Sequence, residues 1–299
     1  MIAATDLTKK FGEKRALDAI SCSIPSGSVF GLIGSNGAGK STLLRTIAGV
    51  YRADGGELTV DGASPFENPG VKGRLFFVPD FPCFFPQATL RTMARFYSLV
   101  YPHWDSERYH ELCGIFPIGE TDKLANMSKG MQRQALIILA LSTRPDYLLL
   151  DEIFDGLDPV IRQLVKRLLA EEVGVRGASV VIASHNLREL EDVCDHIGLM
   201  HRGGILLERE LDELKLGIHK VQAAFLPAKG REDFSALDLV SFEARGSLVS
   251  LVARGDRDQI VETLERMSPV FLEALPLTLE EVFISEMEVA GYDLENILR

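Results

Sequence analysis

The chain has 299 residues, 46% of them hydrophobic, which is enough for one large domain and a smaller one. Its formal net charge of −11 argues against a general binder of nucleic acid or of anionic membranes, because both usually need a basic face. The longest apolar run, at 135–141, is far shorter than the roughly 18–20 residues of a membrane span. The N-terminus lacks the layout of a signal peptide, so we expect a cytosolic, soluble protein.

Short apolar runs alternate with helix-like segments over the first two thirds of the chain. This alternation predicts an α/β fold in which helices cover a mostly parallel sheet. Leu58–Val60 and Ile205–Glu208 are expected to be hairpin or edge strands, and residues 88–145 a helical subdomain inserted between two sheet strands. The expected sheet strands are Ser28–Ile33, Leu75–Val78, Tyr147–Leu150, Ser179–Ala183 and Ile197–Met200.

The pattern changes near residue 212, which we take as the end of the first domain, 1–212. Beyond it come alternating apolar runs at 221–226 and 247–253 and an amphipathic stretch at 259–267. These features predict a small α+β accessory domain over 213–299. Four widely spaced cysteines show no metal-ligand spacing and are expected to be free thiols: Cys22, Cys83, Cys113 and Cys194.

The stretch GSNGAGKS, residues 34–41, matches the phosphate-binding loop G-x-x-x-x-G-K-S/T between a strand and a helix-compatible segment. In such a P-loop the glycines let successive backbone N–H groups point at phosphate oxygens, and the helix presents its positive end. Lys40 would contact the β- and γ-phosphates, and the Ser41 hydroxyl would bind Mg²⁺. The predicted nucleotide-binding residues here are Gly34, Ser35, Asn36, Gly37, Ala38, Gly39, Lys40, Ser41 and Thr42.

A second site signal is the acidic end of an apolar strand, YLLLDEIFDGLDP, residues 147–159. Carboxylates at the end of a buried strand need a positive partner. Asp151 is placed to hold Mg²⁺, and Glu152 to reach past the metal and polarise an attacking water as the catalytic base.

Together these motifs resemble the ATP-binding subunit of a bacterial ABC transporter, over about residues 2–212. MSKGMQ, residues 127–132, matches the family's signature loop, usually LSGGQ, and places Ser128 and Gly130 on its serine and second glycine. GLDP, residues 156–159, matches the loop that crosses the dimer interface. The resemblance also places His185 on the catalytic γ-phosphate sensor, and Phe11 on the aromatic residue that stacks on adenine.

The resemblance implies ATP hydrolysis with Mg²⁺ by two copies that meet head to tail, each ATP lying between the Lys40 loop of one and the Ser128 loop of the other. It further implies a separate transmembrane permease subunit, a place on the cytoplasmic face of the membrane and no nucleic-acid partner. A homodimer or a heterodimer is compatible with these motifs. The FYSLVYPHWD wording and a closing helix at 279–283 resemble drug and antimicrobial-peptide exporters. The alternative is a soluble ABC ATPase acting on a protein or nucleic-acid assembly.

Three positions depart from the family pattern. Asp80 stands where the family has a glutamine, and it keeps an oxygen for Mg²⁺ but loses the amide donor. Lys129 replaces a signature glycine and would face either phosphate or solvent. Ile153–Asp155 replaces the usual Pro-Thr-Ser, which leaves Asp155 without a role. The aromatic segment Phe81–Phe85, together with Tyr101 and Trp104, is either a surface for the membrane subunit or core under the helical subdomain.

Overall fold

The computed structural model describes residues 1–211, 213, 217–275 and 277–282. The chain divides into two compact units, Met1–Glu208 and Arg209–Arg299, and this division falls four residues before the expected boundary at 212 (212 minus 208). Each unit has its own sheet and its own cluster of buried side chains. Phe283, where the expected closing helix ends, lies outside the described residues.

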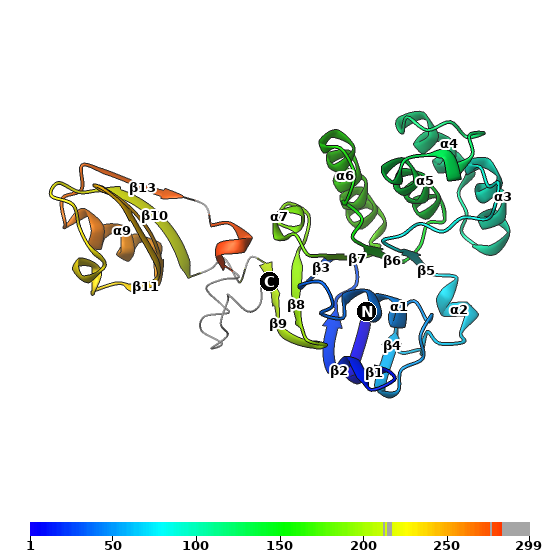
Figure 1. Ribbon diagram of the computed structural model, residues 1–299, viewed down its shortest axis with the longest axis horizontal. Coiled ribbons are helices and arrows are strands. Elements are labelled where there is room, and N and C mark those ends of the chain that lie inside the picture. The colour runs from blue at the N-terminus through cyan, green and yellow to red at the C-terminus, as the bar shows by residue number, and fades with distance from the viewer. Residues whose placement is uncertain (212, 214–216, 276, 283–299) are drawn as a thin grey trace. The chain divides into compact units, whose positions relative to one another are not determined.

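A six-stranded sheet forms the centre of the first unit, with the order β5-β6-β7-β3-β8-β9 (Figure 1). The neighbours β5 and β6, β6 and β7, β7 and β3, and β3 and β8 run parallel. Strands β3, β6 and β7 are buried along their whole length, as in parallel sheets covered on both faces. The strands are β3 (Val29–Ile33), β5 (Leu75–Val78), β6 (Tyr147–Asp151), β7 (Ser179–Ser184), β8 (His196–His201) and β9 (Gly204–Glu210). The predicted α/β fold is confirmed.

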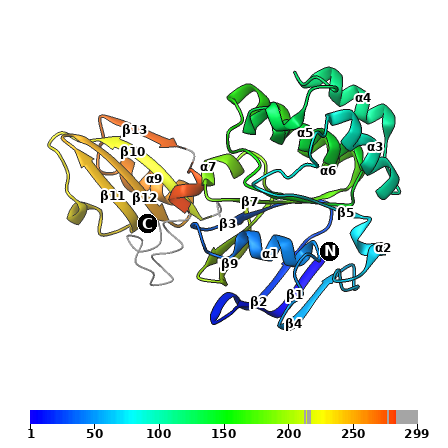
Figure 2. The same ribbon diagram turned by 45° about the vertical axis from the view of Figure 1, so that its right-hand side comes forward.

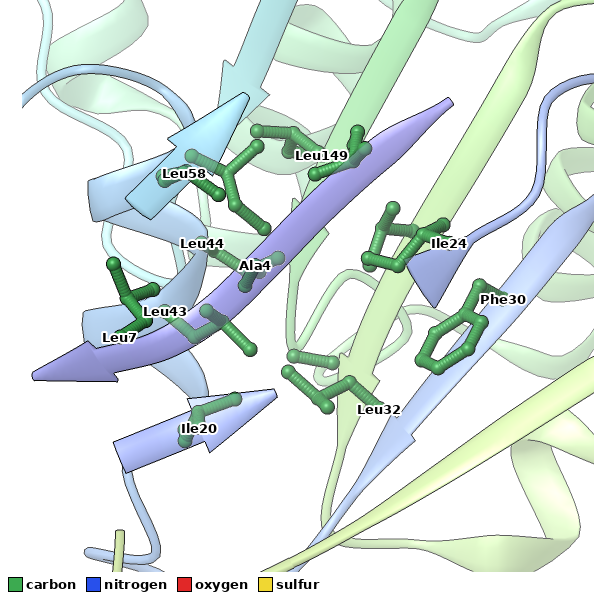
Figure 3. Packing of buried hydrophobic residues seen from close by; sticks show 14 of the residues in the cluster. Ala4, Leu7, Ile20, Ile24, Phe30, Leu32, Leu43, Leu44, Leu58 and Leu149 are labelled. Atoms are coloured by element: carbon green, nitrogen blue, oxygen red, sulfur yellow. The ribbon is translucent and has the colours of Figure 1, made fainter. Parts of the chain in front are cut away.

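The first unit also contains a three-stranded antiparallel sheet, ordered β2-β1-β4. Helix α1 lies between this sheet and the six-stranded sheet (Figures 1 and 2). Figure 3 shows how Leu43 and Leu44 of α1 meet Leu7 of β1 and Leu149 of β6 in one apolar cluster. This packing fixes the first turn of α1 relative to both sheets. The elements are β1 (Ile2–Phe11), β2 (Lys14–Ile24), α1 (Lys40–Ile47) and β4 (Gly55–Val60).

The helical subdomain follows β5 in the chain and precedes β6. Each of its helices begins at a side chain that accepts a backbone N–H: Thr89 for α3, Asp105 for α4 and Ser128 for α5. Its helices are α3 (Leu90–Val100), α4 (Ser106–Ile115) and α5 (Lys129–Ser142), and the other helices of the unit are α2 (Pro69–Lys72), α6 (Pro159–Arg176) and α7 (Leu187–Leu190). In the part of the chain that the structure describes, no helix is both long and apolar enough to cross a membrane.

The second unit contains a four-stranded antiparallel sheet, ordered β11-β12-β10-β13, with helix α9 packed on one face. Phe225, Phe234 and Leu251 lie in its core, where Ile260 and Leu264 of the helix cover them. The expected runs at 221–226 and 247–253 correspond to β10 and β12, and the amphipathic stretch to α9. The elements are β10 (Ile218–Ala224), β11 (Asp238–Arg245), β12 (Leu248–Arg254), α9 (Arg257–Glu265) and β13 (Phe271–Leu275).

Candidate active site

Strand register brings the predicted phosphate-binding, metal-binding and catalytic residues to one edge of the large sheet. Ile33, the last residue of β3, pairs with Ser184, the last of β7, and Val78 of β5 pairs with Leu150 of β6. The carboxyl ends of these four parallel strands therefore coincide, which is where open α/β sheets bind ligands. The loops that begin there carry the P-loop, Asp80, Glu152 and His185.

The P-loop curls tightly around the first turn of α1. Gly39 precedes the helix with φ 112°, and a Cβ atom there would lie 2.6 Å from the carbonyl oxygen of Ala16, so only glycine fits. The Lys40 side chain folds back so that its Nζ donates to the carbonyl of Gly34 at 2.6 Å, and the residue is 5% exposed. An ammonium group and a helix N-terminus thus face the same space.

Asp151 and Ser41 together form a small oxygen cluster beside that space. The Ser41 hydroxyl donates to Asp151 Oδ1 at 3.0 Å, while Oδ2 of this fully buried carboxylate has no hydrogen-bond partner among the described residues. Burial raises the pKa of Asp151 above its ordinary value, and the Ser41 hydrogen bond opposes that shift. A buried, unsatisfied carboxylate oxygen next to a hydroxyl has the chemistry of a hard divalent cation site, so these residues fit Mg²⁺.

Glu152 lies between two cationic or ionisable groups. Its Oε1 is 3.5 Å from Lys40 Nζ, and its Oε2 is 2.9 Å from His185 Nδ1. Its backbone has φ 50°, in the left-handed region that non-glycine residues seldom occupy. Strained backbone of this kind is concentrated at functional sites. The structure brings Lys40, Glu152 and His185 together, as the motifs predicted.

The two aspartates that follow Glu152 have different surroundings. Asp155 contributes a carboxylate oxygen that lies within 4.8 Å of ligand atoms of Glu152 and His185, a proximity that the sequence did not indicate. Asp158 caps α6: its Oδ1 accepts the backbone N–H groups of Val160 and Ile161, each at 3.0 Å. The interface role that the resemblance implies for GLDP stays a prediction.

Asp80 is held by an arginine that none of the sequence motifs marks. Arg133 of α5 donates through Nη2 to Asp80 Oδ1 at 2.8 Å and to the Asp80 carbonyl at 2.7 Å. Asp80 also lines the cavity beside the P-loop. The predicted role of Asp80 as a metal ligand stays a prediction, and one of its carboxylate oxygens is already engaged. No sequence signal marks this pair, because the two residues are 53 positions apart.

The signature segment forms the N-terminus of α5. Ser128 is the N-cap, and its hydroxyl accepts the N–H of Met131 at 3.2 Å. Gly130 packs closely on the loop before α6, since a Cβ there would lie 2.5 Å from the Gly156 carbonyl oxygen. Lys129 is exposed and its Nζ lies 5.4 Å from the centroid of the Phe81 ring. Whether Lys129 faces phosphate or solvent in a dimer stays a prediction.

The P-loop borders a cavity of about 290 Å³. Phe11 lines it and is 45% exposed, with an edge-to-face contact to Tyr51 at 5.2 Å between ring centroids. An exposed aromatic ring at the mouth of a cavity can stack on a flat base. The residues that line this cavity are Phe11, Lys14, Ala16, residues 35–42, Asp80 and Glu152.

The segment after Asp80 is at the surface and not in the core. Phe81 and Phe85 are 69% and 56% exposed, and Phe85 contacts Phe96 of α3. Leu99 and Val100, at the end of α3, are exposed as well. Of the two alternatives for the aromatic residues, burial under the helical subdomain is therefore wrong for Phe81 and Phe85, whereas Tyr101 packs on the buried ring of Phe76. We call the five exposed side chains, Phe81, Phe85, Phe96, Leu99 and Val100, the α3 apolar surface.

Comparison with known proteins identifies the family. A sequence model described as ABC transporter matches residues 17–155. The ABC transporter ATP-binding protein YtrB of Bacillus subtilis (strain 168) is 32% identical over 290 residues, 96% of this chain and 98% of the relative. The bacitracin transport ATP-binding protein BcrA of Bacillus licheniformis is 31% identical over 218 residues, 72% of this chain and 71% of the relative.

Solved structures give the same fold. One of them is the dimeric structure of a post-hydrolysis state of an ATP-binding cassette bound to ADP and Pi, with a TM-score of 0.64 and 22% identity. The alignment covers 71% of this chain and 99% of that cassette, a P-loop NTPase fold. With the YtrB match spanning both units, this chain belongs to the ABC transporter family as one of its ATP-binding proteins, whose characteristic activity is ATP hydrolysis.

Proposed function

We propose that this chain hydrolyses ATP with Mg²⁺ in the dimeric state and so powers a separate membrane-spanning permease, most consistently an exporter. The observation that carries the proposal is the arrangement of Glu152 between Lys40 and His185, next to the Ser41–Asp151 pair. It brings together a phosphate-binding cation, a general base with its hydrogen-bonding partner, and two oxygen ligands for a divalent ion, of which Lys40, Ser41 and Glu152 line one cavity.

Each side chain has a distinct task in this proposal. Lys40 and the α1 N-terminus bind the β- and γ-phosphates. Glu152 accepts a proton from the attacking water, and His185 fixes the orientation of the Glu152 carboxylate through their 2.9 Å hydrogen bond. When bound between Ser41 and Asp151, Mg²⁺ would neutralise phosphate charge. Phe11 stacks on the adenine ring.

The dimer in this proposal completes the site. Ser128 and Gly130 do not line the cavity of their own chain. The signature loop is therefore free to act on nucleotide held by another copy, where its helix N-terminus faces the γ-phosphate. A homodimer is sufficient because both halves are present in this sequence, and a heterodimer is the alternative. The dimeric cassette bound to ADP and Pi supports this arrangement by fold similarity.

The α3 apolar surface supports a membrane-protein partner. Exposed apolar side chains mark interaction sites; Phe85 and Phe96 of this surface are in contact, and Phe81 directly follows Asp80 of the nucleotide cavity. Docking there would place the chain at the inner face of the cell membrane. BcrA is a bacitracin transport ATP-binding protein, and the tail resemblance to exporters favours export for this chain. The net charge of −11 disfavours a nucleic-acid partner.

The test is the variant Glu152→Gln, with Glu171→Gln as the matched control on an exposed part of α6. Removing a general base should lower kcat by about 10²–10⁴-fold. ATP binding and ATP-dependent dimerisation, measured by fluorescence titration and light scattering, should persist. Turnover within twofold of the wild type would overturn the role of Glu152.

Docking to a permease is tested separately, in cells that express this chain together with the membrane protein encoded by a neighbouring gene. The wild-type chain should sediment with membranes, and Leu99→Glu, which places a charge on the α3 apolar surface, should release it without loss of ATPase activity. A Leu99→Glu chain that still sediments with membranes would contradict docking through this surface. Direction is then read from ATP-driven movement of substrate into inverted vesicles.

A further inference from the structure

The first two turns of α5 hold the segment that begins at Asp80. Lys129 and Arg133 lie four residues apart and therefore on one face of the helix. Arg133 binds the Asp80 carboxylate and carbonyl, and Lys129 lies over the ring of the next residue, Phe81. Two consecutive residues after β5 are thus fixed by two consecutive turns of the signature helix.

The same arginine also binds the loop that follows the catalytic glutamate. Arg133 Nη1 donates to the carbonyl oxygen of Asp155, while Nη2 serves Asp80. Arg133 is 5% exposed, so its guanidinium group is largely shielded from water. The planar guanidinium fork directs two separate nitrogens at two acceptors, a geometry that the single ammonium nitrogen of a lysine does not reproduce.

Both segments held by Arg133 border the site of hydrolysis. Asp80 lines the cavity that also contains Lys40 and Glu152. The side chain of Asp155 has an oxygen within 4.8 Å of ligand atoms of Glu152 and His185. Arg133 therefore links two walls of the site through the helix that begins at the signature loop.

We propose that Arg133 is a positioning residue for ATP hydrolysis, and that Asp80 acts chiefly as its counter-ion and not as a metal ligand. The proposal rests on the proposed function. Arg133 fixes the distance between the Asp80 wall and the loop at Asp155, so a shift of α5 moves both walls together. Movement of the signature helix is thereby coupled to the surroundings of Glu152.

The aspartate at position 80 follows from this pairing. A buried guanidinium group is costly without a negative partner, and a charge-assisted hydrogen bond is stronger than one to a neutral amide. The Asp80 side chain is 31% exposed and that of Arg133 6%, so Asp80 can be replaced with less risk to folding. This difference makes Asp80→Asn the safer variant and Arg133→Lys the more informative one.

The experiment measures kcat, KM for ATP and half-saturation by Mg²⁺ for the full chain and three variants: Asp80→Asn, Arg133→Lys and the double variant. Arg133→Lys keeps the charge but cannot hold both walls, so kcat should fall by about 10–100-fold, the cost of misplacing catalytic groups. KM should change by less than about threefold because the P-loop is intact. Asp80→Asn should lower kcat by about 3–10-fold and leave Mg²⁺ half-saturation within about twofold of the wild type.

The double variant shows whether the two residues act as a pair. If they do, its kcat should be close to that of Arg133→Lys alone, since residues that share one interaction are non-additive. Arg108→Lys, a buried arginine of α4 away from the cavity, controls for a general effect of weakening an internal ion pair and should keep wild-type kcat.

Four results would overturn the proposal. They are a wild-type kcat for Arg133→Lys, independent effects in the double variant, a kcat loss in Arg108→Lys equal to that in Arg133→Lys, and a large rise in Mg²⁺ half-saturation confined to Asp80→Asn. The last result would make Asp80 a metal ligand. If Arg133→Lys does not fold, the Mg²⁺ half-saturation of Asp80→Asn alone decides whether Asp80 is a counter-ion or a metal ligand. Inactive wild-type protein would instead refute the proposed function.

Discussion

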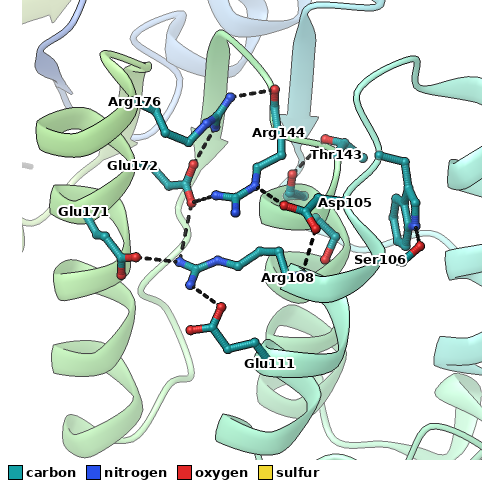
Figure 4. A network of polar contacts seen from close by, with 12 residues as sticks. Asp105, Ser106, Arg108, Glu111, Thr143, Arg144, Glu171, Glu172 and Arg176 are labelled. Atoms are coloured by element: carbon teal, nitrogen blue, oxygen red, sulfur yellow. Dashed lines mark hydrogen bonds and ion pairs between the residues drawn. The ribbon is translucent and has the colours of Figure 1, made fainter.

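Glu172 of α6 is at the centre of an ion-pair network that joins α6 to α4 and to the segment after α5 (Figure 4). It is 3% exposed and accepts from Arg144 at 3.1 Å and from Arg176 at 2.5 Å, with Arg108 at 3.5 Å. The network therefore ties the helical subdomain to the sheet-bearing core. The informative perturbation is Glu172→Gln, which keeps the shape and removes the charge.

The structure sets the size of the effect. Removing one partner of a buried ion pair costs about 3–5 kcal/mol. Arg144 and Arg176 are about a quarter exposed, with side-chain values of 26% and 25%, so water screens part of the loss. Glutamine also keeps an acceptor oxygen. We therefore expect a loss of about 2–3 kcal/mol, and a fall in Tm of about 4–12 °C at roughly 2–4 °C per kcal/mol for this size of domain.

The neighbouring residue provides the matched control. The Glu171 side chain is 47% exposed and has one contact with Arg108 at 3.4 Å, so Glu171→Gln should cost less than about 1 kcal/mol. Thermal unfolding is followed by the fluorescence of Trp104, the single tryptophan of the chain, and by far-ultraviolet circular dichroism. A Tm for Glu172→Gln equal to that of Glu171→Gln would refute the assignment of buried, weakly screened charge to Glu172.

Two further predictions concern the active site. Because burial raises the folded-state pKa of Asp151, the charged carboxylate destabilises the metal-free fold, and this cost develops as pH rises from the unfolded carboxyl pKa of about 3.9 through the raised value. Asp151→Asn should therefore raise Tm by about 2–4 °C in chelator at pH 7 and remove activity, and an unchanged or lower Tm would contradict this. Gly130→Ala should cost about 1–3 kcal/mol in urea denaturation, because its Cβ would lie 2.5 Å from the Gly156 carbonyl oxygen. Gly174→Ala, which meets nothing within 4 Å, is the control, and equal stability of the two variants would exclude the close approach.

The parts of the site that were predictable are those whose chemistry is contiguous in the sequence. Residues 34–42 form a loop and a helix start that depend on local glycines, and Asp151–Glu152 directly follows an apolar strand. Their meeting point follows from parallel strand register alone. Sequence pattern is sufficient where a function is built by one short segment at the end of a strand.

Strands β1 and β2 of the N-terminal antiparallel sheet escaped prediction because they are irregular, whereas the expected edge strand Leu58–Val60 lies within β4. Register shifts interrupt the β1–β2 pairing, and Asp6 and Ala19 have φ values of 48° and 50°. These irregularities break the strict two-residue alternation by which a half-buried strand is found. Bulges change which face a side chain occupies, and the sequence does not mark where they occur.

The ion pairs escaped prediction for a different reason, because they join residues that are distant in the sequence. Arg108 and Glu172 are 64 positions apart, and Arg133 and Asp80 are 53 positions apart. An isolated arginine in a helical pattern is equally consistent with a solvated side chain and with a buried partner. Only packing of the helices onto the core decides which arginines lose water and therefore need a carboxylate.

The carboxylates at the cavity differ in the positive charge that already faces them, and this difference orders their roles. Three acids near bound phosphates would repel one another without a cation. The sequence alone did not decide whether Asp80 binds that cation. Asp80 has a guanidinium group at 2.8 Å from Arg133, and Glu152 has the ammonium group of Lys40 at 3.5 Å. Asp151 alone of these three has a buried oxygen without a hydrogen-bond partner, and the charge of Arg45 offsets only part of the rise in its pKa caused by burial. A divalent cation gains most where a buried negative charge is least compensated, so removal of the Asp151 charge should abolish Mg²⁺ binding together with activity, whereas removal of the Asp80 charge should leave an active, Mg²⁺-dependent enzyme.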